Sequence, residues 1–175
     1  MRVPLVVCLP GEPARAVARS AHVDVLPTLA AIAEARLNTA VAAQVEGRSL
    51  LPLLKDPGAE WPDRTLFTHV GRWPRGTDPQ EYKYRQCSIR TPRWHLVCTA
   101  DDGRKAWQLF DLAADPGEKT DVAAAHPGVV RDLDAAYDAW WASVQPQLVN
   151  ENAVAPAVNP FKELFEKQFG PAAAK

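Results

Sequence analysis

The segment from Gln86 to Thr99 has the sequence QCSIRTPRWHLVCT. It contains two strand-like runs, Gln86–Arg90 and Trp94–Thr99, joined by a Thr-Pro pair that is short enough for a hairpin. Alternating runs also lie on either side, at Leu66–Val70 and, after an Asp-Asp-Gly turn signal, at Trp107–Leu112. We therefore predict a four-stranded antiparallel sheet.

A helix is predicted immediately after this sheet, opening at Pro127. Its apolar positions step by 3, 4, 3 and 4, which is the period of an amphipathic helix, and Trp141 widens the stripe. The stripe consists of Val130, Leu133, Tyr137, Trp140 and Val144. We expect this face to cover one side of the sheet, with Trp140 as a large buried ring.

The first 55 residues have a different pattern. Leu5–Leu9 is a continuous apolar run bounded by prolines, which predicts a strand buried on both faces of a parallel or mixed sheet. A helix is expected over Asp24–Ala35 with Asp24 as its N-cap, and a helical turn over Leu50–Leu54 capped by Ser49.

The predicted fold class is α/β (α+β). Residues 1–55 are interpreted as a remnant of an α/β core, 56–147 as an antiparallel subdomain with its helix, and 148–175 as an extended tail. A short helix is expected in the tail around Phe161–Phe169.

The composition of the chain excludes several classes of function. The chain has 175 residues, a net charge of -1 and 47% apolar residues, which excludes wholesale disorder and gives no basic footprint for nucleic acid. No apolar run approaches the ~18 residues that span a bilayer, so no membrane partner is expected. The N-terminal apolar stretch is too short for a signal peptide, so the sequence assigns no location.

The cysteines and histidines supply no catalytic or metal-binding set. Cys8, Cys87 and Cys98 include no C-x-x-C pair, which argues against a disulfide framework or structural zinc, and we expect buried thiols. Cys8 begins a C-x-P sequence whose fifth residue is Glu12, where conversion to formylglycine requires Arg. His22 and Asp24 lack a nucleophile or third ligand and are interpreted as capping residues. The sequence therefore predicts no catalytic residue, no metal ligand and no cofactor in this chain.

One cluster has the chemistry of a binding loop. His69, Arg72 and Trp73 follow the first predicted strand of the sheet, framed by Gly and Pro, and arginine suits oxyanions such as sulfate. We predict these three as substrate-binding residues, with an exposed arginine-rich loop as the alternative. The bases between Arg72 and His95 likewise form either a solvated sheet edge beside an acidic helix or a rim for an anionic substrate.

Several segments together resemble the C-terminal part of type I sulfatases, the arylsulfatase-like members of the alkaline-phosphatase superfamily. The resembling segments occur in the family's order: RVP at 2–4, VDVLPTL at 23–29, GRSLLPLL at 47–54, RTPRWHLV at 90–97, and LFDL with DPGE between 109 and 118. The Trp140-Trp141 pair and the tail from Asn150 are similar to a bacterial subgroup.

The resemblance implies a mixed α/β core followed by a small antiparallel subdomain. It also implies sulfuric ester hydrolysis, with calcium and formylglycine in the full-length family, a sulfated small molecule or glycan as substrate, and often a periplasmic or secreted location. The family's formylglycine segment and calcium ligands lie before its R-V-P strand, so no family catalytic residue transfers to this sequence.

The expected function is therefore the C-terminal portion of a sulfatase, with a structural and substrate-rim role and no activity alone. Its expected partner is the N-terminal sulfatase core, and self-association is expected without it. Two alternatives remain: a non-catalytic module that binds sulfated glycans, and a subunit that completes a separately encoded N-terminal half.

Overall fold

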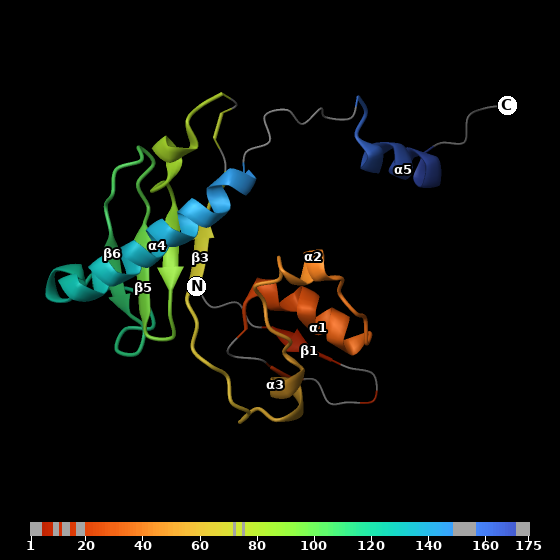
Figure 1. The fold of residues 1–175 in the computed structure, drawn as a ribbon, viewed down its shortest axis with the longest axis horizontal. Coiled ribbons are helices and arrows are strands. Elements are labelled where there is room, and N and C mark those ends of the chain that lie inside the picture. The colour runs from red at the N-terminus through yellow and green to blue at the C-terminus, as the bar shows by residue number, and fades with distance from the viewer. Residues whose placement is uncertain are drawn as a thin grey trace. The chain divides into compact units, whose positions relative to one another are not determined.

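The computed structural model describes residues 5–8, 11, 15–16, 20–71, 73–74, 76–148 and 157–170. It divides the chain into two compact units, residues 1–64 and 65–175. Figure 1 shows the elements of both. Each unit has a hydrophobic core of its own.

The second unit contains the predicted antiparallel sheet. Its strands are β3 (Leu66–His69), β4 (Cys87–Arg90), β5 (Trp94–Cys98) and β6 (Gln108–Asp111). They are hydrogen-bonded in the order β3-β4-β5-β6, and every neighbouring pair is antiparallel. The Thr-Pro junction makes the β4–β5 hairpin, where the Thr91 amide donates to the Trp94 carbonyl at 2.8 Å. The sheet prediction is confirmed.

The long helix α4 (Pro127–Leu148) lies across one face of this sheet (Figure 1). Proline suits its first turn because the N–H that it lacks would have no partner within the helix. Alternate strand residues point at the helix, as the pleat requires. The fully buried members of this core are Cys87, Ile89, Leu96, Cys98, Leu109 and Tyr137.

The expected packing of the helix is corrected at one position. Trp141, placed at the margin of the stripe, is 1% exposed, whereas Trp140 is half-buried and stacks on Phe67 with ring centroids 5.2 Å apart. The apolar stripe of α4 is broad, and its Trp141 side is covered by residues of the segment after β3, including Gln80. Cys87 and Cys98 are buried as predicted.

The first unit contains α1 (Val25–Ile32), α2 (Thr39–Ala42) and α3 (Leu51–Lys55), with a 3-10 turn, η1 (His22–Asp24), before α1. The helix α3 begins one residue later than predicted, with Leu50 rather than Ser49 at its N-cap position, although the Ser49 hydroxyl does accept from the Leu51 amide at 3.3 Å. Leu50, Leu53 and Leu54 form the small core of this unit.

The predicted buried strand at Leu5–Leu9 is wrong. β1 is only Val6–Val7, paired antiparallel with β2 (Arg15–Ala16) in a two-stranded sheet. Val6 is 61% exposed and Cys8 is also exposed, so the expected buried thiol at Cys8 is wrong too. A strand is buried on both faces only when a layer covers each face, and the described residues of this unit supply no such pair of layers.

Two helices present apolar residues to solvent. On α1, Val25, Leu26, Leu29 and Ile32 are 40% to 58% exposed. The predicted tail helix is α5 (Pro160–Phe169), which begins where the Asn159 side chain accepts from the Phe161 and Lys162 amides. Among the described residues, no helix is both long and apolar enough to cross a bilayer.

Candidate functional site

The loop after β3 begins at His69, whose two ring nitrogens are both hydrogen-bonded. The Gly71 amide donates to Nδ1 at 2.8 Å, and Nε2 lies 2.8 Å from the Tyr82 carbonyl. Because Nδ1 accepts an N–H, the ring proton belongs on Nε2, which donates to Tyr82. Burial lowers the pKa of His69 more than the hydrogen bond to Tyr82 raises it. His69 is therefore a neutral imidazole that fixes the start of the loop.

Two indoles, those of Trp73 and Trp141, contact this imidazole, and the Tyr82 ring contacts Trp73. We call the four rings together the aromatic cluster: His69, Trp73, Tyr82 and Trp141. The ring centroid of His69 lies 4.8 Å from that of Trp141 and 6.2 Å from that of Trp73. Trp73 also lies 6.1 Å from Tyr82. The Trp141 indole N–H donates to Gln80 Oε1 at 3.1 Å, which connects α4 to the 3-10 turn η2 (Pro79–Tyr82).

Two of the three predicted site residues are thus brought together. His69 and Trp73 are both half-buried in the aromatic cluster, whereas Arg72 lies outside the described residues. Sequence reasoning missed Tyr82 and Trp141. Asp78 followed by Pro79 is a sequence signal for the start of a helix, and the Asp78 side chain accepts a hydrogen bond from the Gln80 amide. These two residues could therefore have predicted η2.

Most described bases near this loop have carboxylate partners. Lys83 pairs with Asp138 at 2.8 Å, and Lys105 pairs with Asp134 at 2.5 Å, both on α4. Burial would lower the pKa of Lys83, but Asp138 and Tyr84 raise it above its usual value. These pairs match the interpretation of a sheet edge beside an acidic helix. Arg85 differs, since its guanidinium lies over the Tyr82 ring, 4.1 Å from the centroid.

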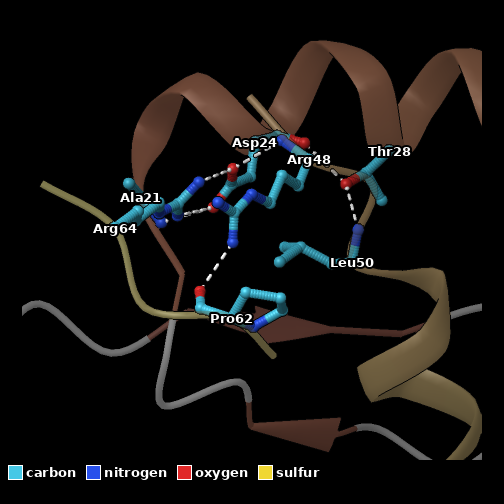
Figure 2. Close-up of polar contacts among 7 residues, drawn as sticks. All are labelled: Ala21, Asp24, Thr28, Arg48, Leu50, Pro62 and Arg64. Atoms are coloured by element: carbon cyan, nitrogen blue, oxygen red, sulfur yellow. Dashed lines mark hydrogen bonds and ion pairs between the residues drawn. The ribbon is translucent and has the colours of Figure 1, made fainter. Parts of the chain in front are cut away.

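The first unit has a polar centre of a different kind at Asp24 (Figure 2). Its carboxylate is fully buried. Oδ1 accepts from the Arg48 amide at 2.9 Å and from Arg64 Nη1 at 2.7 Å, while Oδ2 accepts from the Ala21 amide and from Arg64 Nη2. Burial would raise the pKa of Asp24, but these hydrogen bonds, with that from Arg64 the largest, hold it below its usual value.

Asp24 therefore occupies the N-cap position of α1 without capping that helix through its side chain. Because η1 precedes α1, the carboxylate turns back to the Ala21 amide and closes η1 instead. Each oxygen accepts two hydrogen bonds, so Asp24 has little capacity left for a metal ion or a substrate proton. We interpret these residues, called the Asp24 network (Ala21, Asp24, Arg48 and Arg64), as structural.

Neighbouring groups hold the same segments together. The Thr28 hydroxyl donates to the Asp24 carbonyl at 2.6 Å and accepts from the Leu50 amide at 2.9 Å (Figure 2). At Gly47, a Cβ atom would lie 1.8 Å from the Val23 carbonyl oxygen, so only glycine fits this close approach. The VDVLPTL and GRSLLPLL segments are thus packed directly against each other.

Comparison with known proteins identifies the group to which these segments belong. Residues 1–135 match the family model described as N-sulphoglucosamine sulphohydrolase, C-terminal. The chain belongs to this family of sulfatase C-terminal domains. It is 31% identical to mouse (Mus musculus) arylsulfatase K over 140 residues, covering 77% of this chain and 24% of that protein. The choline-sulfatase of Rhizobium meliloti (strain 1021) is 33% identical over 146 residues, covering 78% of this chain and 26% of that protein.

This sulfatase C-terminal domain spans about a quarter of the length of the curated relatives it matches. Among solved structures, Ps i-CgsB in complex with k-i-k-neocarrahexaose superposes with a TM-score of 0.51 at 22% identity, covering 67% of this chain and 23% of that one. That likeness agrees with the predicted fold class. Because animal and bacterial relatives match at similar identity, the likeness to a bacterial subgroup stays a prediction.

Sulfatases use calcium and formylglycine. Within the described ranges, no three His, Cys, Asp or Glu side chains come close enough to hold a metal ion. The carboxylate oxygens of Asp24 already accept four hydrogen bonds from neighbouring groups. Cys8 begins a C-x-P sequence, but Glu12 stands where the C-x-P-x-R pattern requires Arg. The described residues do not fit a calcium or formylglycine site.

Proposed function

We propose that this chain forms the C-terminal part of a sulfuric ester hydrolase, that it supports the catalytic core and lines the substrate entrance, and that it does not hydrolyse sulfate esters alone. The observation that carries the proposal is the family match across residues 1–135. Two observations on the described residues support the last part: no metal-ligand group is present, and Asp24 is saturated with donors.

The proposed substrate rim is the loop after β3. Neutral His69 holds the start of this loop through the Gly71 amide, and the half-buried Trp73 packs beside His69. We assign to Arg72 the role of donating two parallel hydrogen bonds to a sulfate group, which the guanidinium fork suits. The substrate is then a sulfated small molecule or glycan, in keeping with relatives that are sulfatases by name.

A second candidate is a subunit that completes a separately made catalytic half. The exposed apolar residues of α1 favour it, because 40% to 58% exposure of four apolar side chains leaves an uncovered surface. DNA sequencing upstream of the Met1 codon distinguishes the two. A C-x-P-S-R coding segment, in frame or shifted by one base, supports a single sulfatase gene, whereas an independent promoter and ribosome-binding site support the subunit.

Turnover tests the proposal directly. The purified chain, supplied with calcium and 4-nitrophenyl sulfate, is expected to release nitrophenol at the rate of buffer alone. Turnover above that rate that Cys8→Ser abolishes would overturn the proposal. In a full-length sulfatase containing this chain, Arg72→Ala should raise KM for the sulfate ester, while Arg131→Ala, on the exposed side of α4 and paired with Asp132, should not.

A further inference from the structure

Arg85 has no acidic partner among the described residues. The other described arginines of the same unit each pair with a carboxylate: Arg90 with Glu118 at 3.5 Å, Arg93 with Asp111 at 2.8 Å, Arg104 with Asp102 at 2.5 Å and Arg131 with Asp132 at 3.1 Å. Arg85 Nε is also buried without a hydrogen-bond acceptor. A buried donor without an acceptor costs free energy, so the arrangement needs a reason other than stability.

The backbone around Arg85 explains why the Nε atom of Arg85 is buried. The turn between β5 and β6 contains Gly103 at φ +77, and a Cβ there would lie 2.4 Å from the Glu81 carbonyl oxygen and 3.7 Å from Arg85 Nε. The turn therefore packs against the chain just before Arg85 and covers Nε. The two terminal nitrogens have no acidic partner in the part of the chain that the structure describes, and neither is a buried unsatisfied atom, so both are accessible to solvent.

The guanidinium continues the aromatic cluster. It stacks over Tyr82 at 4.1 Å, and Tyr82 lies 6.1 Å from Trp73 between ring centroids. Tyr82 is itself positioned by its carbonyl, which accepts from His69. The result is a continuous series of groups, Arg85, Tyr82 and Trp73, with a planar cation at one end and an indole at the other.

No described acid forms an ion pair with this cation, and the two acids in the turn before Gly103 are engaged elsewhere. Asp101 accepts from the Gln86 side chain at 2.5 Å, and Asp102 pairs with Arg104. An arginine whose guanidinium lies over a ring, and which has no carboxylate partner among the described residues, suits bidentate binding of an oxyanion. The faces of aromatic rings suit the apolar face of a bound ring.

We propose that Arg85, Tyr82 and Trp73 form a binding site for a sulfated sugar, in which Arg85 donates to the sulfate oxygens and the aromatic residues contact the sugar ring. The choice of sulfate rests on the proposed function. The choice of an oxyanion rests on Arg85 itself. Arg85 and Tyr82 are thereby added to the predicted rim.

The test is a titration of the whole 175-residue chain with N-acetylglucosamine 6-sulfate, followed by the NMR signals of the Trp indole N–H groups. N-acetylglucosamine and its 6-phosphate serve as reference ligands. Arg85→Gln removes the cation and Arg85→Lys keeps the charge without the fork. Arg93→Gln is the matched control, because Arg93 also stacks on an indole, at 4.5 Å from Trp94, but pairs with Asp111.

The sulfated sugar should bind the parent chain and shift the Trp73 indole, and the unsulfated sugar should not. Arg85→Gln should weaken binding by about tenfold or more, Arg85→Lys by less, and Arg93→Gln by less than about twofold. Arg85→Gln should unfold in urea at a midpoint no lower than that of the parent, because a cation with an unsatisfied donor is removed.

Four results would overturn the proposal: no binding by the folded parent, equal binding by Arg85→Gln, equal binding of the 6-phosphate, or a large fall in the unfolding midpoint of Arg85→Gln. The last would make Arg85 a structural residue. The titration involves no catalysis, so its outcome is separate from that of the proposed function. If the chain hydrolysed sulfate esters alone, the proposed function would be wrong, but the result of the binding titration would still stand.

Discussion

The Trp141 indole lies directly against the His69 imidazole, with ring centroids 4.8 Å apart. Trp141 belongs to α4, His69 ends β3, and the indole N–H donates to Gln80 in η2. One side chain thus connects the helix, the sheet and the turn that supports the candidate site. Trp141 rather than Trp140 is the residue on which this region depends.

Replacing Trp141 with Ala should therefore be the more damaging of two neighbouring changes. Removing a fully buried ring costs about 3–5 kcal/mol, and Trp141 is 1% exposed. Trp140→Ala should cost less, because Trp140 is half-buried and loses chiefly its stacking on Phe67. Urea unfolding followed by far-UV circular dichroism measures both. A larger loss in Trp140→Ala would show that the helix packs through the other side of its stripe.

The stability of the second unit should fall as the pH drops below about 6.5, the ordinary pKa of histidine. Burial lowers the pKa of His69 in the folded chain, so below that pH the unfolded chain binds more protons than the folded chain. Protonation also removes the acceptor that Nδ1 offers to Gly71. Urea midpoints at a series of pH values measure the slope.

His69→Gln should flatten part of this slope, since the substituted side chain does not titrate. His95, whose pKa burial also lowers despite Glu118, should supply the remainder, so the His69→Gln, His95→Gln pair should flatten it further. The exposed His22 lies in the first unit, and His22→Gln provides the control for the substitution itself. An unchanged slope in His69→Gln would mean that its ring is not held neutral.

Asp24→Asn should destabilise the first unit strongly. The amide cannot accept from all four donors, and breaking a buried ion pair by removing one partner costs about 3–5 kcal/mol. The Arg48 amide, which donates to Asp24 Oδ1, should exchange its hydrogen much faster. Asp102→Asn is the control, because its pair with Arg104 is exposed and screened by solvent, so the change should hardly alter stability. Slow exchange at Arg48 in Asp24→Asn would contradict the role given to the Asp24 network.

The isolated chain should self-associate through the apolar residues of α1. Leu26 and Leu29 are 54% and 58% exposed, and contiguous exposed apolar side chains promote association. The double change Leu26→Glu, Leu29→Glu should lower the average mass in light scattering. Lys55→Glu, on the neighbouring α3, controls for added negative charge. A monomeric parent at high concentration would refute the prediction.

The sheet could be predicted because its signals are local. The alternation in Trp94–Cys98 and the turn residues between strands act over a few positions, and the structure keeps them. The two-stranded pairing of β1 could not be predicted, since burial of a strand depends on layers far away in sequence. Likewise, adjacent Trp140 and Trp141 both fall on the stripe, and only the position of η2 decides which is buried.

Only part of the candidate site could be predicted from the sequence. His69 and Trp73 lie four residues apart and stand out as a cluster. Arg85 looks like any other base between Arg72 and His95, because the sequence shows a positive charge but not the absence of a partner. The sequence predicts the N-cap position of Asp24 but not the partners of its side chain, because Arg48 and Arg64 lie 24 and 40 residues further on.

That separation of 40 residues sets an order of events during synthesis. Units of a chain fold as they emerge from the ribosome, N-terminal part first. Of the groups that donate to the Asp24 carboxylate, the Ala21 amide is synthesised first, the Arg48 amide later, and the Arg64 guanidinium last. A nascent chain that stalls before Arg64 holds a carboxylate that cannot be buried with its charge satisfied. We therefore expect the first unit to close only after Arg64 has emerged from the ribosome, which makes Arg64 the residue that completes it.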